Sequence, residues 1–250
     1  MSEHIRSDET KSVLEHIGEL RRKLFIALAA LIIGGSVAHH FHQEIIALIL
    51  KPAGSQQLLF LSPLEPFFFI LKVDLIAGLI LAFPIVFWCI FSYIKPALPV
   101  RARAVLFGAS LVSLILLIAG LLYAYLVTIP LSLTFLSSII IPGVENAITM
   151  QHYLGFFFSQ ALIIMLVFQI PIIIITGLSL GIFTVKMLSS KRRYVYLLGT
   201  VGLAIITPTT DIFNLGIILA PTIVIFEFSL IAGLIMQFLK RKKTNSSHSA

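Results

Sequence analysis

FFFILKVDLIAGLILAFPIVFWCIFSYI, residues 67–94, is a run of 28 residues in which only Lys72 and Asp74 carry charge. At about 1.5 Å per residue an α-helix of this length covers the hydrocarbon core of a bilayer, which is about 30 Å thick and needs roughly 20 residues. This stretch therefore predicts a transmembrane helix, and the same test can be applied to the rest of the chain.

Five other apolar runs give further candidate spans, at residues 24–41, 104–129, 153–180, 194–206 and 212–238. The chain of 250 residues is 58% hydrophobic and 12% charged, with a mean hydropathy of +1.05, so it lacks the polar residues needed to cover a soluble core. We predict an all-α, polytopic membrane protein with six transmembrane helices. Residues 1–239 would form one membrane domain with a cytoplasmic N-terminal helix, and residues 240–250 a basic and polar tail.

Basic residues set the orientation of these spans. Sixteen of the eighteen Lys and Arg residues fall in four segments that alternate along the six-span pattern: Arg6, Lys11, Arg21, Arg22 and Lys23; Lys95, Arg101 and Arg103; Lys186, Lys191, Arg192 and Arg193; and Lys240, Arg241, Lys242 and Lys243. The positive-inside rule places these segments and both termini in the cytoplasm. The net charge of +7 then faces anionic lipid head groups, so it does not indicate nucleic-acid binding.

The last two spans are predicted to be short. Residues 194–206 supply only about 20 Å of helix, and Pro221 is expected to interrupt the sixth span because proline removes a helical hydrogen bond. The hairpin between them, residues 207–211, would then lie below the usual membrane surface, with local thinning of the bilayer. Alternatively, the fifth span tilts less or extends into its polar flanks.

Two segments on the outer side connect the longer spans. Residues 42–66 contain an apolar cluster at helical spacing, which predicts a short interfacial helix, and residues 130–152 predict a continuation of the third span. Together these segments are expected to form an outer cap.

Motifs for covalent chemistry are weak. Gly177–Gly181 fits the G-x-S-x-G pattern of hydrolases, but Asp211 and His248 would lie too far from Ser179 to complete a triad. Three neighbouring histidines, His39, His40 and His42, lack the spacing of a metal site and are interpreted as interfacial polar residues. We therefore expect no enzymatic activity, no metal and no cofactor.

Polar residues inside the predicted spans are costly and should face protein. Gln169 precedes Pro171 in the fourth span, and Glu227 lies in the middle of the sixth. Each could bind a neighbouring helix of the same chain or have a functional role. Lys72 and Asp74, near the outer end of the second span, could pair or extend towards the membrane surface.

The inner face is basic, so a cationic ligand would have to bind the few carboxylates of the N-terminal segment. Glu15 and Glu19 are four residues apart and share one side of a helix that runs into the first span. They could equally form weak ion pairs on a solvated helix face.

Around these residues the sequence resembles the TatC family, the receptor subunit of the twin-arginine protein translocase. The segment HIGELRRKL, residues 16–24, resembles the family's entry to the first span. Further landmarks follow in the family's order: SPLEPF at 62–67 with Lys72, LAFP at 81–84, KPAL at 95–98, FQIP at 168–171, and TPTTDIFN at 207–214. The resemblance covers nearly the whole chain.

The resemblance implies a receptor in the inner membrane of a bacterium, or in an organellar membrane. Signal peptides with paired arginines would bind at the cytoplasmic face, single-span subunits of the TatA and TatB type would be recruited, and the receptor itself would be a homo-oligomer. The residues implied for signal-peptide binding are Glu19, Glu15, Arg21 and Arg103, and those for partner-helix contact are Gln169, Thr207, Pro208, Asp211 and Glu227.

Two positions depart from the family pattern. Ala102 stands where a second glutamate is common, so Glu15 or another subunit would have to supply the second acceptor, or recognition is altered. Gln169 replaces a glutamate found in many members and cannot carry charge. The alternative function is a secondary transporter for a small solute with Gln169 and Glu227 at its midplane, followed by a purely structural scaffold.

Overall fold

The computed structural model describes residues 2–54, 56–94, 100–139, 147–179, 181–207 and 211–246, although some side chains within these ranges, including those of residues 2–16 and 101–107, are not described. The chain divides into two compact units: residues 1–48 with 66–106, and residues 49–65 with 107–250. We describe each unit by itself.

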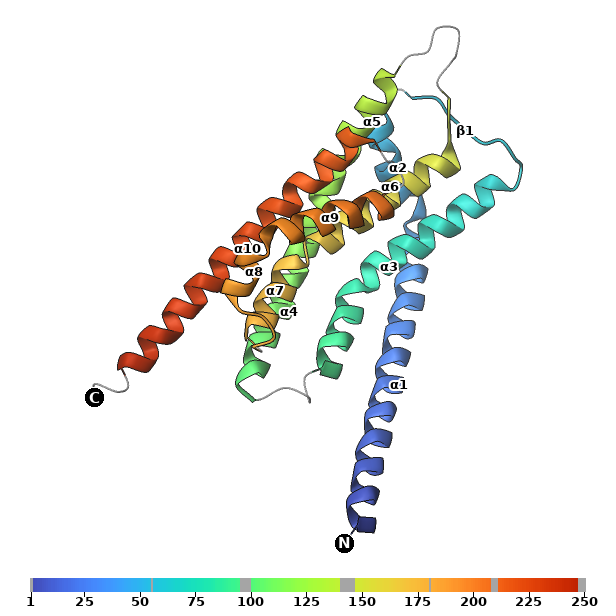
Figure 1. Ribbon diagram of the computed structural model, residues 1–250. Helices are drawn as coiled ribbons and strands as arrows, with labels where there is room; N and C mark the ends of the chain where they lie inside the picture. Colours follow the sequence, from blue (N-terminus) through green and yellow to red (C-terminus); the bar gives the residue numbers. More distant parts are fainter. Residues whose placement is uncertain are drawn as a thin grey trace. The chain divides into compact units, whose positions relative to one another are not determined.

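The first unit contains two long helices that cross. Helix α1 (Ser2–His40) includes the first predicted span, and α3 (Glu65–Ile94) is the second. The ribbons of α1 and α3 cross (Figure 1). They meet at glycines, because a Cβ on Gly34 would lie only 2.6 Å from the carbonyl oxygen of Gly78. Such small residues allow helix backbones to touch inside a membrane.

The second unit contains the remaining spans. The third is a continuous run of α4 (Val100–Tyr123), which begins in the first unit, the π-helical turn η3 (Ala124–Thr128) and α5 (Ile129–Ser138). The fourth consists of α6 (Met150–Val167) and α7 (Ile170–Ser179). Helices α8 (Val185–Ser190), α9 (Arg192–Ile206) and α10 (Ile212–Ser246) complete the chain. The predicted continuation of the third span beyond residue 130 is confirmed.

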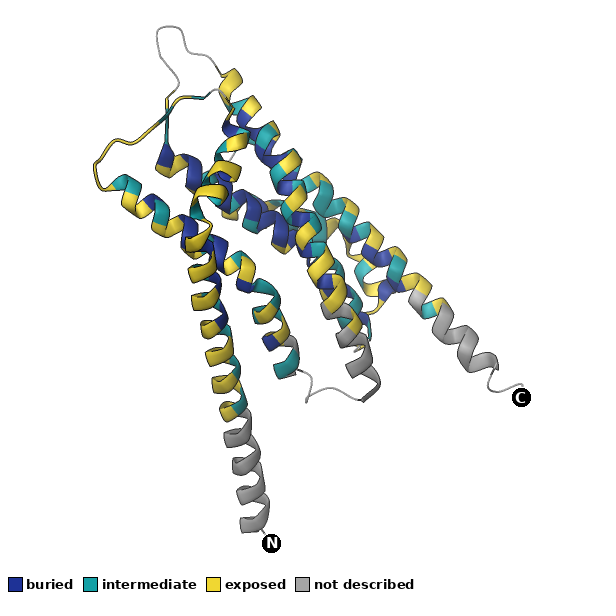
Figure 2. Cartoon of the chain, turned by 180° about the vertical axis from the view of Figure 1, so that it is seen from behind, coloured by how far each residue is buried: buried dark blue, intermediate teal, exposed yellow. Residues whose placement is uncertain are grey.

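The core of the second unit lies around α6. Most residues of α6 are buried (Figure 2), and Ala161 and Ile164 pack with Ala124 of η3, Leu203 of α9 and Ile218 of α10. A second cluster joins α7, α8 and α10 through Ile174, Leu178, Val185, Phe226 and Leu230. The burial of α6 explains why its polar residues must find partners within the protein.

The two outer segments are joined to each other. The predicted interfacial helix is α2 (His42–Leu50), followed by the 3₁₀ turn η1 (Lys51–Ala53). Two short strands, β1 (Leu58–Leu59) and β2 (Ile148–Thr149), pair in parallel. The Tyr153 hydroxyl also donates to the carbonyl of Ile49 at 2.5 Å. These strands were not expected from the sequence, because two residues carry no periodicity.

Five helices of the described chain are long and apolar enough to cross a membrane, namely 17–40, 65–90, 111–138, 150–179 and 212–235. The predicted fifth span falls within α9, which has only 15 residues and is therefore short. The expected interruption of the sixth span at Pro221 is not observed, since α10 continues through this residue and has 35 residues in all. Proline removes one helical hydrogen bond and can bend a helix, but in a membrane the remaining bonds and neighbouring groups keep the helix continuous. Helix α10 also includes the first seven residues of the predicted tail.

Candidate functional site

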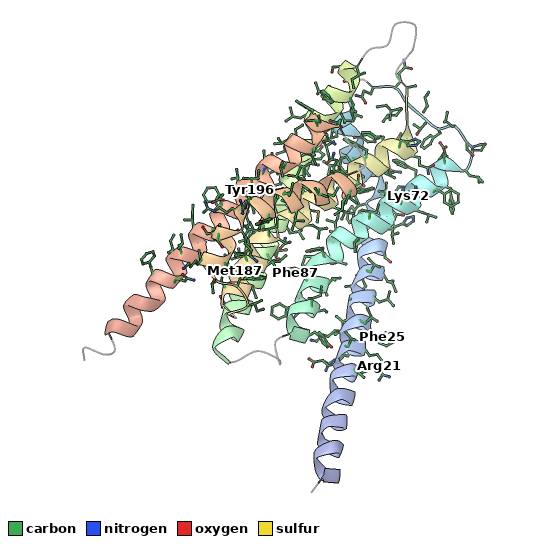
Figure 3. All side chains as sticks on the ribbon, viewed as in Figure 1. Arg21, Phe25, Lys72, Phe87, Met187 and Tyr196 are labelled. Atoms are coloured by element: carbon green, nitrogen blue, oxygen red, sulfur yellow. The ribbon has the colours of Figure 1, made fainter. Side chains whose placement is uncertain are left out.

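Glu19 lies on the part of α1 that extends towards the predicted cytoplasmic side. Its side chain is half-buried, and Arg21 is exposed. A shallow hollow begins beside it and is lined by Gly18, Arg21, Arg22, Phe25, Ile26 and Ala29. Arg21 and Phe25 lie about one turn apart along α1 (Figure 3). A carboxylate therefore adjoins a surface that combines apolar side chains with basic ones.

Three predicted site residues lie outside what the structure describes. The backbones of Glu15 and Arg103 belong to α1 and α4, but their side chains are not described, and Pro208 lies in the undescribed segment 208–210. The roles of these residues remain predictions.

Glu227 joins α9 to α10. The Tyr196 hydroxyl donates a hydrogen bond to Glu227 Oε1, and Arg192 Nη2 forms an ion pair with Glu227 Oε2 at 3.0 Å. The carboxylate side chain keeps 30% of its surface exposed. Arg192 and Tyr196 were missed as partners, although their spacing of four residues places them on one side of α9. The carboxylate thus has protein partners from α9, as polar groups within a span require.

Gln169 is enclosed by the protein. It is only 4% exposed, accepts a hydrogen bond from Ser113 Oγ at 2.6 Å, and donates to the Ser113 carbonyl at 3.3 Å. This arrangement matches the intramolecular helix-to-helix role considered for Gln169. A partner helix could reach this amide only by displacing Ser113.

Thr207 and Asp211 flank the hairpin between α9 and α10. Thr207 is buried, and its backbone N–H donates to the Leu203 carbonyl at 2.8 Å. Asp211 Oδ1 accepts from the backbone N–H of Asn214 at 2.6 Å, which is the geometry of an N-cap at the start of α10. Asp211 therefore begins the helix that carries Glu227.

Asn214 is the centre of a buried polar cluster that the sequence did not reveal. Its Oδ1 accepts from Ser132 Oγ at 2.5 Å and from Gln160 Nε2 at 3.0 Å. All three side chains are at most 1% exposed. The cluster ties α5, α6 and α10 together.

Of the two alternatives given for Lys72 and Asp74, pairing with each other is not observed. Lys72 is exposed, whereas Asp74 is buried and lies 2.7 Å from Nδ1 of His39 on α1. Residues two apart on a helix point in different directions, which explains the difference. His39 therefore makes a polar contact between two helices rather than being a simple interfacial histidine.

The comparisons with known proteins agree with these landmarks. The family model of TatC, described as Sec-independent protein translocase protein, matches residues 15–221. The chain belongs to the TatC family. A TatC relative from Koribacter versatilis is 30% identical over 247 residues, which cover 96% of this chain and 91% of the relative. One from Carboxydothermus hydrogenoformans is 28% identical over 238 residues, covering 94% and 97%.

Membership of the TatC family also holds at the level of structure. A crystal structure of the twin-arginine translocase receptor TatC in DDM matches with a TM-score of 0.77 and 28% identity, covering 87% of this chain and 99% of that chain. A chloroplast TatC protein of Pisum sativum is 31% identical over 223 residues, covering 88% and 63%. The family is thus found in bacterial and organellar relatives, and this chain is a multi-pass membrane protein of the same kind.

The alternative of a small-solute transporter is not supported. It required Gln169 and Glu227 to form a joint midplane site, but Gln169 bonds to Ser113 and Glu227 bonds to Tyr196 and Arg192. TatC proteins are translocase components, which is a different class from small-solute carriers.

Proposed function

We propose that this chain is the receptor subunit of a twin-arginine protein translocase. It binds the signal peptides of folded cargo proteins at the cytoplasmic face and catalyses no covalent reaction. The observation that carries the proposal is the half-buried carboxylate of Glu19 beside an apolar and basic hollow on α1, in a chain of the TatC family.

Signal peptides supply complementary chemistry, since a positively charged segment precedes an apolar stretch. Glu19 would accept charge-assisted hydrogen bonds from an arginine of the peptide. Glu15 would be the second acceptor, because Ala102 stands where a second glutamate is common in the family. Phe25 and Ile26 would contact the apolar stretch. Arg21 and Arg103 would border the site and limit how many cations it accepts.

We place recruitment of single-span TatA- and TatB-type subunits along α9 and α10. Support comes from the exposed apolar residues of α9, among them Leu197, Leu198 and Ile205, and from the partly exposed carboxylate of Glu227. Thr207, Pro208 and Asp211 would border this surface at the outer hairpin, and Gln169 would join it only after release from Ser113. Homo-oligomerisation of the receptor is part of the same proposal.

The experiment is photo-crosslinking of a twin-arginine signal peptide to the full chain in membranes. We expect Glu19→Ala and Glu19→Gln each to reduce the arginine-dependent crosslink by about 10- to 150-fold, because each charged hydrogen bond contributes about 1.5 to 3 kcal/mol. Glu44→Gln is the matched control, since Glu44 is an exposed glutamate on α2.

A peptide with two lysines in place of the arginines reports the non-specific background. Equal crosslinking of the parent and both Glu19 variants, with all proteins inserted in the membrane, would contradict the proposed binding site.

A further inference from the structure

The crossing of α1 and α3 is made by glycines on both helices. A Cβ on Gly78 would lie 2.5 Å from the backbone N of Gly35 and 3.0 Å from the carbonyl carbon of Gly34. The two backbones are therefore in direct contact, and this contact sets the distance between the helices. Because glycine has no side chain, the contact specifies the rotation of α1 about its own axis only weakly.

The buried face of α1 consists of small residues. Among its side chains that the structure describes, residues 17–40, only Ala30 and Ala38 are buried together with Gly34. Successive residues of a helix differ by about 100° around the axis, and either Gly34 or Gly35 could face Gly78 without a clash of side chains. A further contact must select one rotational setting.

The pair of His39 and Asp74 supplies this contact. His39 Nδ1 lies 2.7 Å from Asp74 Oδ2, one turn of α3 outward from Gly78. Asp74 is 8% exposed, and its Oδ1 is buried without a hydrogen-bond partner, so the carboxylate depends on His39. The His39 side chain itself remains 68% exposed, so the pair is part-buried, with the carboxylate on its enclosed side. Polar contacts between membrane helices help to fix how the helices pack.

His39 is held towards Asp74 by α2. His42 Nδ1 contacts the His39 carbonyl oxygen at 2.7 Å, and the two imidazole rings stack with centroids 5.4 Å apart. The ring of His39 thus reaches Asp74 in one setting of α1, and a turn of α1 by one residue would carry it away.

We propose that His39 and Asp74 are positioning residues that set the rotation of α1 and thereby the direction in which Glu19 faces. Glu19 and His39 belong to one continuous helix and lie about 30 Å apart along it. A rotation at the outer end is transmitted along the helix to the inner end. This inference rests on the proposed function, because that function gives the direction of Glu19 its importance.

The rotation can be read by disulfide formation in a Cys89→Ser background, since Cys89 is the one cysteine of the chain. Ala30 and Ala82 lie one turn inward from Gly34 and Gly78 and are both buried. We expect the pair Ala30→Cys with Ala82→Cys to crosslink, and the pair Leu31→Cys with Ala82→Cys to crosslink poorly. His39→Leu or Asp74→Leu should reduce the ratio of the first yield to the second by about three- to fifteenfold, as the strength of polar contacts between membrane helices predicts.

Two controls separate positioning from general damage. The exchange His39→Asp with Asp74→His restores a pair of the same groups and should restore the crosslink ratio. His40→Leu changes the neighbouring exposed histidine and should leave the ratio unchanged. A loss of folding alone would lower both crosslinks together and would not shift the ratio.

Signal-peptide crosslinking is the second readout. The single variants should lower the arginine-dependent crosslink and the exchange should recover it. An unchanged disulfide ratio in His39→Leu and Asp74→Leu would overturn the positioning role. If the parent protein forms no arginine-dependent crosslink, the proposed function fails, while the disulfide ratio still tests whether the pair sets the rotation of α1.

Discussion

The two units hold their helices together in different ways. In the first unit, α1 and α3 touch through the glycines at 34, 35 and 78, and the His39–Asp74 pair adds a polar contact between them. In the second unit, polar side chains on several helices meet in the core, at Gln169 and at Asn214. Close backbone contact requires residues without side chains, whereas a buried polar cluster requires every polar group in it to have a hydrogen-bond partner. Different substitutions should therefore lower the stability of the two units.

The largest effect is expected at the glycine crossing. Gly78→Leu should lower the free energy of unfolding by about 3 kcal/mol, because even its Cβ would lie 2.5 Å from the backbone of Gly35 and the helices would have to separate. Gly155→Leu is the matched control, since a Cβ there meets no atom within 4 Å. Denaturant titration in detergent measures both, and equal stability of the two variants would show that the crossing tolerates side chains.

The next effect is expected at the polar cluster of the second unit. Asn214→Leu should cost about 2 kcal/mol, because Ser132 and Gln160 lose the acceptor that they share. A double-mutant cycle tests this reason directly: Ser132→Ala should cost clearly less in the Asn214→Leu background than in the parent. Additive costs would mean that the two residues are not coupled.

The smallest effect on stability is expected at Glu227, where the carboxylate is partly exposed. Glu227→Gln should cost less than about 1 kcal/mol, because exposed ion pairs contribute little and the amide can still accept from Tyr196. Crosslinking of a single-span partner to α9 should nevertheless fall if this surface recruits it. The matched comparison is Gln169→Leu, which should affect stability more than recruitment. The reverse pattern would assign partner contact to Gln169.

Much of the fold could be predicted from local sequence. Apolar runs and basic segments are local signals, and they located α1, α3, the third and fourth spans and the short α9. The continuation of α10 through Pro221 could not be predicted, because the effect of a proline depends on what surrounds the free carbonyl. The strands β1 and β2 are too short to leave a pattern and form because two distant segments meet.

The candidate site was predicted by residue but not by arrangement. The family motif indicated Glu19, and the cost of a carboxylate inside a span indicated Glu227. No spacing rule connects Glu227 with Arg192 and Tyr196, or Asp74 with His39, which is 35 residues away. The signal for Asp74 was the cost of a carboxylate inside a span, which predicts that a partner exists without saying which.

The sequence by itself determined that this chain crosses a membrane, on which side its termini are expected to lie, and to which family it is similar. Hydropathy, loop charge and motif order are properties of the linear sequence and need no knowledge of helix packing. Only the tertiary structure decided which polar groups meet. Gln169 bonds to Ser113, which is 56 residues away in the sequence, and Asn214 bonds to Ser132, which is 82 residues away. A hydrogen bond joins atoms only about 3 Å apart. Such contacts exist only once helix packing has brought distant segments together.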